Sequence, residues 1–142
     1  MNIAVFDVET NGMAGTSVLS ASSIVFDGEG RLLGLFNRFY LPIEPPDERV
    51  ARVHGLTPGR LLELRKKLEA PLHFLEDWPD LLSFWDDCDV TGVAVHNLAF
   101  DASFLPEVAQ ATRLWWCSMK GLSAYCAIPK RFGRSGRAGA FK

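Results

Sequence analysis

Two carboxylates near the N-terminus, Asp7 and Glu9, have the clearest chemical potential in this sequence. They follow an apolar run and are separated by one residue, so in a β-strand they point to the same face. Two acids on one face of a buried strand repel each other and lose hydration unless a cation compensates. The usual compensation is a hard divalent metal ion, which prefers oxygen ligands. The alternative is a strand ending in two solvated acids, since the turn-forming run Thr10-Asn11-Gly12 follows directly.

A second polar group lies in the segment VAVHNLAFDASFL, residues 93–105. Its pattern predicts a strand that ends at His96 and a helix capped by Asn97. Asp101 would then lie about one turn inside that helix, where its carboxylate can face the carboxyl edge of the sheet. Ligands of open α/β sheets bind at that edge. The alternative for Asp101 is an acid near a helix N-terminus that the helix dipole stabilises.

A third candidate is His54 in the segment VHGLT, residues 53–57, which is predicted to be a loop between two short helices. A single histidine in a loop is more often structural than functional. Its spacing alone therefore leaves both roles open.

The elements that must position these residues follow a simple order. Strands are predicted at 2–8, 18–27 and 31–41, and the first reads as buried because nearly all of it is apolar. Two short helices near 47–53 and 58–67 follow, the second with Thr57 and Pro58 as N-cap and first helical residue, and then an amphipathic helix near 72–86. Strands at 90–95 and 113–117 alternate with helices at 98–111 and 118–127. A meander followed by βα units predicts an α/β fold with a mixed sheet.

Length and composition fit one globular domain of 142 residues with 48% hydrophobic residues. The net charge of −2 is unevenly distributed. Residues 130–142 hold five cations and no acid, namely Lys130, Arg131, Arg134, Arg137 and Lys142. An acidic body with a basic tail suits either phosphate contact or solubility.

Cysteine use and the N-terminus indicate a cytoplasmic protein. The three cysteines, Cys88, Cys117 and Cys126, show no CxxC spacing and are expected to be free thiols. We see no signal peptide and no apolar run long enough to span a bilayer, so no membrane partner is expected. Of the pair Trp115 and Trp116, strand alternation predicts one ring in the core and one outside.

Three segments together resemble the DEDD superfamily of 3′–5′ exonucleases. FDVETNG at 6–12 resembles the first motif of that family, ARVHGLT at 51–57 resembles its loop before the central helix, and VAVHNLAFDASFL resembles its second motif. Their order and spacing also match, over roughly residues 2–128. The resemblance is closest to the branch with a catalytic histidine, which includes the proofreading epsilon subunit of bacterial DNA polymerase III.

This resemblance implies a ribonuclease H-like fold, with a mixed five-stranded sheet flanked by helices. It implies hydrolysis of phosphodiester bonds at nucleic-acid 3′ ends with two divalent ions, Mg²⁺ or Mn²⁺. Substrates would be single-stranded DNA or RNA 3′ ends, with DNA favoured, and a DNA polymerase subunit would be a candidate partner. The motif match assigns catalysis and metal binding to Asp7, Glu9 and Asp101, and substrate binding to Thr10, His54 and Asn97.

The sequence departs from the family in one respect. The family has a third motif, a histidine followed five residues later by an aspartate, whereas this sequence has no histidine after His96 and no aspartate after Asp101. We therefore expect residues 1–128 to be an exonuclease-like domain whose C-terminal portion is missing, and residues 129–142 to be a basic Gly/Arg-rich loop or tail. The sequence can be part of an active exonuclease, which we favour, a natural truncation or inactive relative, or a chain completed by a helix from another chain. Weak or absent cleavage is expected, and the alternative function is an inactive nucleic-acid-binding or polymerase-docking module.

Overall fold

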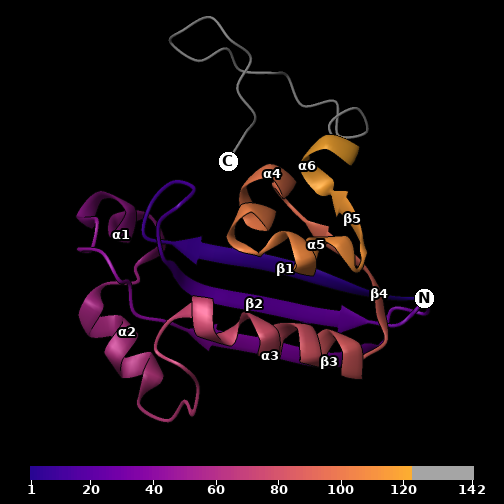
Figure 1. Ribbon diagram of the computed structural model, residues 1–142, viewed down its shortest axis with the longest axis horizontal. Helices are drawn as coiled ribbons and strands as arrows, with labels where there is room; N and C mark the ends of the chain where they lie inside the picture. Colours follow the sequence, from indigo (N-terminus) through magenta and orange to yellow (C-terminus); the bar gives the residue numbers. More distant parts are fainter. Residues whose placement is uncertain (123–142) are drawn as a thin grey trace, which may run out of the picture.

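The computed structural model of the protein describes residues 1–122, which form a five-stranded mixed sheet (Figure 1). The strand order is β3-β2-β1-β4-β5, so β1 lies in the centre. It pairs antiparallel with β2 and parallel with β4, and β5 is parallel to β4. The strands are β1 Asn2–Thr10, β2 Val18–Phe26, β3 Leu32–Phe39, β4 Val90–Val95 and β5 Leu114–Cys117. The predicted α/β fold with a mixed five-stranded sheet is confirmed.

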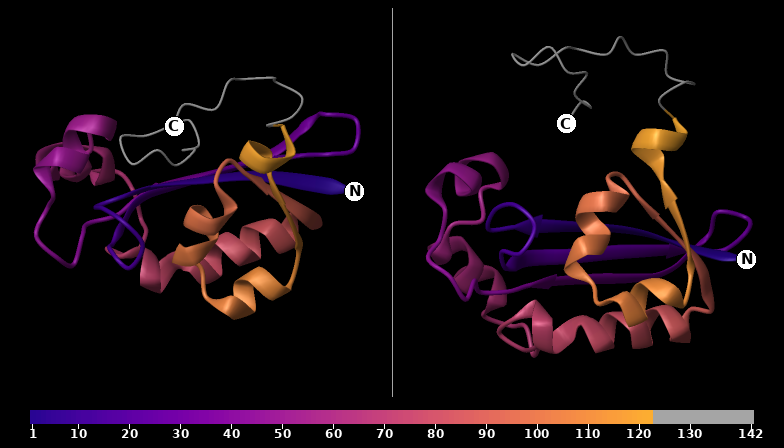
Figure 2. Two further views of the ribbon diagram at one scale, coloured as in Figure 1. Left: turned by 90° about the horizontal axis from the view of Figure 1, so that it is seen from above. Right: turned by 45° about the horizontal axis from the view of Figure 1, so that its top comes forward.

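The helices are short apart from one. Their bounds are α1 Glu48–His54, α2 Pro58–Arg65, α3 Phe74–Asp87, α4 Leu98–Asp101, the 3-10 turn η1 Ala102–Phe104, α5 Glu107–Ala111 and α6 Ser118–Gly121. Figure 2 shows α3, α4 and α5 on one side of the sheet. The predicted start of α2 is confirmed, because the Thr57 side chain accepts a hydrogen bond from the Arg60 N–H at 3.2 Å.

The main core lies between α3 and the sheet. Trp85 of α3 is fully buried, and its ring meets the edge of Phe6 at 5.5 Å between centroids. Its indole N–H donates to the Ser23 hydroxyl on β2 at 2.8 Å, which satisfies the polar end of this large side chain. These contacts fix α3 across β2 and β1, and β1 is the strand that carries the N-terminal motif.

The central strand β1 is buried on one face only. Ala4, Phe6 and Val8 face the helices and are buried, while the alternate residues from Ile3 to Glu9 are exposed within the part of the chain that the structure describes. The prediction of a wholly buried strand was therefore wrong for the second face. The cause is the one-sided placement of α3, α4 and α5.

The single helix predicted at 98–111 was also wrong. Leu105 is extended, with ψ of 142°, and Pro106 precedes α5, so the segment splits into α4, η1 and α5. Proline lacks an amide hydrogen and disfavours a helical conformation in the residue before it, which accounts for the break. Asn97 precedes α4 but its side chain makes no capping hydrogen bond, contrary to the predicted cap.

Several expectations concern the region around β5. Trp115 packs partly buried against the core and Trp116 is exposed, as predicted. Cys88 and Cys117 are free thiols, and no helix in residues 1–122 is long and apolar enough to cross a membrane. Cys126, most of the helix predicted at 118–127, the domain boundary at 128 and the tail 129–142 lie outside the described residues.

Candidate carboxylate site at the edge of the sheet

The N-terminal acid pair lies on one face of β1, as predicted. In the antiparallel register Asp7 is opposite Ser22 and Glu9 is opposite Ser20, while the residues between them point to the buried side. The register shifts between Glu9 and Thr10, which marks an irregularity at the end of the strand. Such bulges are common beside active sites, where they redirect side chains.

Asp101 reaches the same edge of the sheet from α4. Because β4 is parallel to β1, the chain leaves both strands at the same edge, and α4 begins directly after β4. Asp101 is 3% exposed, and one carboxylate oxygen accepts the Asn97 backbone N–H at 3.2 Å. Burial raises the pKa of Asp101, and the negative charge of Asp7 raises this pKa further, against backbone hydrogen bonds at Asn97 and Val8. Two segments far apart in the sequence therefore bring two carboxylates within electrostatic reach.

His96 belongs to this group although the sequence indicated only that a strand ends there. Extending the parallel register from Val5 and Ala94 by two residues places His96 beside Asp7. Asp7 is exposed on this face, but partial desolvation by its neighbours still raises its pKa, and the charge of His96 acts in the opposite direction. The His96 Nδ1 atom lies 3.1 Å from the Ser118 hydroxyl at the start of α6. The signal that could have identified His96 is its parity with Gly92 and Ala94 along β4.

The donor chemistry of these side chains fits a divalent cation. Asp7 and Asp101 carry like charges at short range, and Asp101 is buried, which is the situation that a hard cation relieves. Within residues 1–122, no group of three or more His, Cys, Asp or Glu side chains is close enough together to hold a metal ion. The structure thus brings together Asp7 and Asp101, places Glu9 on the same face as Asp7, and does not assemble a closed ligand set.

Thr10 and His54, two predicted substrate-binding residues, are in direct contact. The Leu56 N–H donates to His54 Nδ1 at 3.0 Å, so the ring proton lies on Nε2. Nε2 then donates to the Thr10 carbonyl at 3.2 Å. Both ring nitrogens of His54 are therefore occupied by backbone groups, and the side chain fixes the end of β1 against the end of α1.

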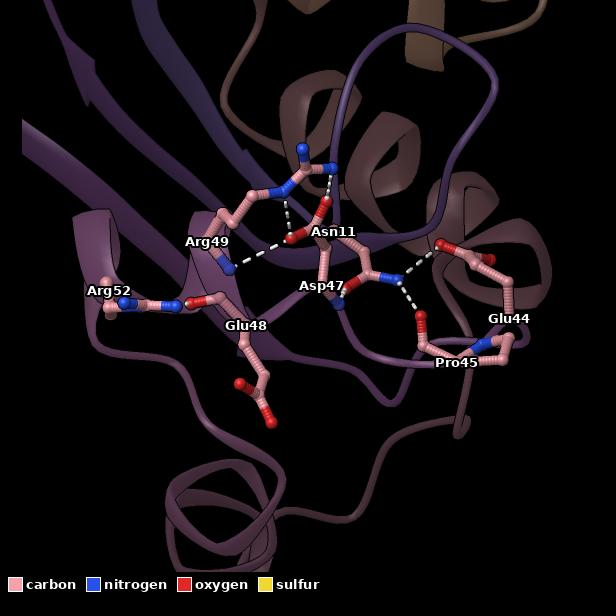
Figure 3. A network of polar contacts seen from close by, with 7 residues as sticks. All are labelled: Asn11, Glu44, Pro45, Asp47, Glu48, Arg49 and Arg52. Carbon is pink, nitrogen blue, oxygen red and sulfur yellow. Dashed lines mark hydrogen bonds and ion pairs between the residues drawn. The ribbon is translucent and has the colours of Figure 1, made fainter.

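Asn11, which the sequence did not single out as functional, joins the turn after β1 to the segment before α1 (Figure 3). Its side-chain amide donates to Glu44 at 2.8 Å and to the Pro45 carbonyl at 3.0 Å, and its side-chain oxygen accepts the Asp47 N–H at 2.9 Å. Asn11 is buried, so these bonds satisfy its polar atoms. The network fixes the residue that directly follows Thr10.

Glu44 is the anchor of this network. Its carboxylate accepts the backbone N–H and hydroxyl of Ser17 at 2.8 and 2.7 Å as well as the Asn11 amide. Partial burial would raise its pKa, but these hydrogen bonds prevail and lower the pKa to about 2. A permanently charged Glu44 therefore ties together the turn that follows the acid pair.

Comparison with known proteins supports the fold. No family model matches the chain, and no curated protein matches its sequence. The structure is similar to exonuclease X in complex with 5′-overhanging duplex DNA, with a TM-score of 0.59 and 17% identity over 94% of this chain and 69% of the other. It is similar to E. coli exonuclease I in complex with a dA16 oligonucleotide, with a TM-score of 0.65 and 18% identity over 99% of this chain and 34% of the other. For exonuclease I from Methylocaldum szegediense the TM-score is 0.63 at 18% identity, covering 97% and 33% of the two chains.

These likenesses concern the fold. The chain has the α/β fold of exonucleases I and X, which is the fold that the resemblance implied. It spans about a third of the length of exonuclease I.

Proposed function

We propose that the chain is the nuclease portion of a metal-dependent 3′–5′ exonuclease that hydrolyses phosphodiester bonds at single-stranded nucleic-acid ends, with DNA as the favoured substrate. The observation that carries this proposal is the pairing of Asp7 with the buried Asp101 at the carboxyl edge of β1 and β4. A buried carboxylate beside a second negative charge is unfavourable for folding alone, and is typical of functional sites. The likeness to exonuclease folds supports this choice of chemistry for the site.

In this proposal Asp7, Glu9 and Asp101 hold two divalent ions, Mg²⁺ or Mn²⁺. Bound there, such ions would supply positive charge for the attacking water and for the departing 3′ oxygen. The backbone of Thr10 meets the terminal nucleotide, and His54 fixes the Thr10 carbonyl in place. The side chain of Asn97 makes no capping hydrogen bond to α4, and the proposal assigns it to binding the same nucleotide.

Cleavage by the 142-residue chain is expected to be slow. The family's third motif, which supplies a general base and a fourth carboxylate, is not in this sequence. Loss of a general base costs about 10²–10⁴-fold in rate. A polymerase subunit as partner stays a prediction from the resemblance.

The second candidate is a nucleic-acid-binding or polymerase-docking module of the same fold without catalytic activity. One observation favours it: the described residues do not bring three potential ligands together around a cation position. In this case the acids would bind one ion weakly or none, and DNA binding would be independent of Mn²⁺.

The test is a trimming assay with a 5′-labelled single-stranded oligonucleotide and Mn²⁺. We expect slow removal of nucleotides from the 3′ end, stopped by EDTA and reduced at least about 100-fold in Asp7→Asn and Asp101→Asn. Glu107→Gln, which changes an exposed acid on α5, is the matched control and should cleave like the wild type. Binding of the oligonucleotide with no trimming in Mn²⁺ would instead establish the inactive module.

A further inference from the structure

One edge of the sheet is formed by β3, and among residues 1–122 no strand lies beyond it (Figure 1). The Tyr40 N–H, directly after β3, donates to the Leu19 carbonyl of β2 at 2.8 Å. The register with β2 is regular over residues 34–39, and backbone groups of a strand alternate between its two sides. The N–H and C=O groups of Leu35 and Asn37 therefore point away from β2, where a further strand can pair with them.

The carboxyl end of this edge is occupied by α2. The Arg65 guanidinium donates to the Phe39 carbonyl and, through its other terminal nitrogen, to the Ala70 carbonyl at 2.8 Å. Phe39 has the same parity along β3 as Leu35 and Asn37, so its bond to α2 agrees with the outward direction assigned to their backbone groups. A new strand can therefore pair only with the part of β3 that precedes Phe39.

The open part of β3 is apolar. Leu32 and Leu35 are each 62% exposed and Leu33 is 45% exposed, and residues 32–37 contain no charged residue and no proline. Natural edge strands are usually protected from pairing by lysine, by proline or by a bulge. Here the register shift between Leu32 and Gly34 lies at the start of the strand and leaves the rest regular. Exposed leucines beside free backbone groups favour the addition of an extended segment.

Residues 123–142 of the same chain do not suit this edge. They follow α6, where Gly121 lies against Trp116 of β5, and a strand added to β3 would be five strand spacings, about 24 Å, from β5. In this segment only residues 123–128 form a run of more than two without charge, glycine or proline. Six extended residues span at most about 22 Å, so this run cannot both cross the sheet and pair with β3. The remainder is rich in glycine and cations, and glycine and lysine are depleted in strands.

We propose that this edge pairs with the same edge of a second copy of the chain, with the two β3 strands antiparallel about a two-fold axis. A two-fold interface uses the same patch on both subunits, and an antiparallel edge offers its copy matching donors and acceptors. With the axis at Leu35, the N–H and C=O of Leu35 bond to the same residue of the copy. The two leucines then lie side by side on the face that carries Ile24, and no charged residue of 32–37 meets a like charge.

This pairing leaves the carboxylate site of each copy uncovered. Antiparallel strands in one continuous sheet require a two-fold axis perpendicular to the sheet. Such an axis keeps the helices of both copies on one side, and it points the carboxyl edges of the two β1 strands in opposite directions. The proposal concerns assembly and stands whether or not the chain cleaves nucleic acid.

The test is sedimentation velocity of the full 142-residue chain over a concentration series up to about 100 µM, in which the wild type should form a dimer. Leu35→Pro should weaken the dimer at least about 100-fold, because it removes an outward N–H that has no bond to β2. Leu35→Lys should have the same effect by placing two cations together at the axis, and it carries the test if the proline variant fails to fold. Val108→Lys, at a position of α5 that is 63% exposed, is the matched control and should dimerise like the wild type.

Amide hydrogen exchange identifies what occupies the edge. The amides of Leu35 and Asn37 face away from β2, so the fold of one copy does not protect them. Their protection should rise with protein concentration, and protection at Asn37 should be lost in Leu35→Lys. Protection that is independent of concentration would assign the edge to residues of the same chain and overturn the proposal. A chain that stays monomeric up to about 100 µM, or a dimer that persists in both Leu35 variants, overturns it as well.

Discussion

At the scale of single residues, the negative charge of the carboxylate site opposes folding. Asp101 is buried, and both its burial and the charge of Asp7 raise its pKa, so its ionised form is disfavoured in the folded protein. The end of β1, by contrast, is held by hydrogen bonds, because His54 contacts the Thr10 carbonyl and Asn11, the next residue, bonds to Glu44. A rigid strand end beside an electrostatically unfavourable acid is what a site designed to receive a cation requires.

The raised pKa of Asp101 predicts the sign of a change in stability with pH. A carboxyl whose pKa is higher in the folded state binds protons more tightly in that state. The free energy of unfolding therefore falls as pH rises from 3.8, the pKa of the unfolded chain, through the higher pKa of the folded protein. In EDTA at pH 7, Asp101→Asn should therefore raise Tm by about 3 °C, even though it removes activity. Calorimetry at pH 7 and below pH 4 checks this, because the gain should shrink at the lower pH. Glu107→Gln should leave Tm unchanged, and a lower Tm for Asp101→Asn would contradict the account.

At the scale of elements, α3 is attached to β3 by a buried ionic group. Asp77 is buried, and its two carboxylate oxygens accept from Arg38 at 2.6 Å and from the Tyr40 hydroxyl at 2.7 Å. Arg38 also contacts Asp80 at 3.0 Å, but the Asp80 side chain is largely exposed. Arg38 thus forms ion pairs with one buried and one exposed carboxylate of α3.

These two acids make a matched pair of variants. Asp77→Ala should lower the free energy of unfolding by about 3 kcal/mol, because it leaves the Tyr40 hydroxyl and Arg38 without their buried partner. Asp80→Ala should cost less than about 0.5 kcal/mol, since exposed ion pairs contribute little. Urea unfolding monitored by circular dichroism measures both values. Equal losses in the two variants would show that burial does not decide the strength of this attachment.

The elements also show what the sequence could and could not predict. The five strands and the start of α2 at Thr57 and Pro58 were predictable, because strand alternation and capping are local signals. The split of 98–111 follows from Pro106. This local signal is present in the sequence, but the apolar periodicity around it favoured the prediction of a single helix. The exposed face of β1 and the place of His96 beside Asp7 depend on which side the helices cover and on strand register, which are tertiary facts.

At the scale of the whole molecule, charge is separated along the chain. The five cations and no acids of residues 130–142 leave the first 129 residues with an acidic excess, and the carboxylate site lies within that part. An acidic body does not attract a polyanion by itself. If the chain binds single strands, the basic segment is the part of the sequence with the charge to contact phosphates.

The salt dependence of binding tests whether residues 130–142 contact the phosphates. For single strands, each phosphate neutralised by a cation contributes about 0.7 to the slope of log Kd against log salt concentration. Replacing all five cations of residues 130–142 by glutamine should therefore reduce that slope by up to about 3.5 and weaken binding of every sequence alike. Fluorescence anisotropy with a labelled single strand, between low and physiological salt, gives the slope. Replacing Arg49, Arg52 and Arg60 on α1 and α2 by glutamine is the comparison. A slope that falls in that variant but not in the variant of residues 130–142 would place the phosphate contacts on α1 and α2 and leave residues 130–142 a role in solubility.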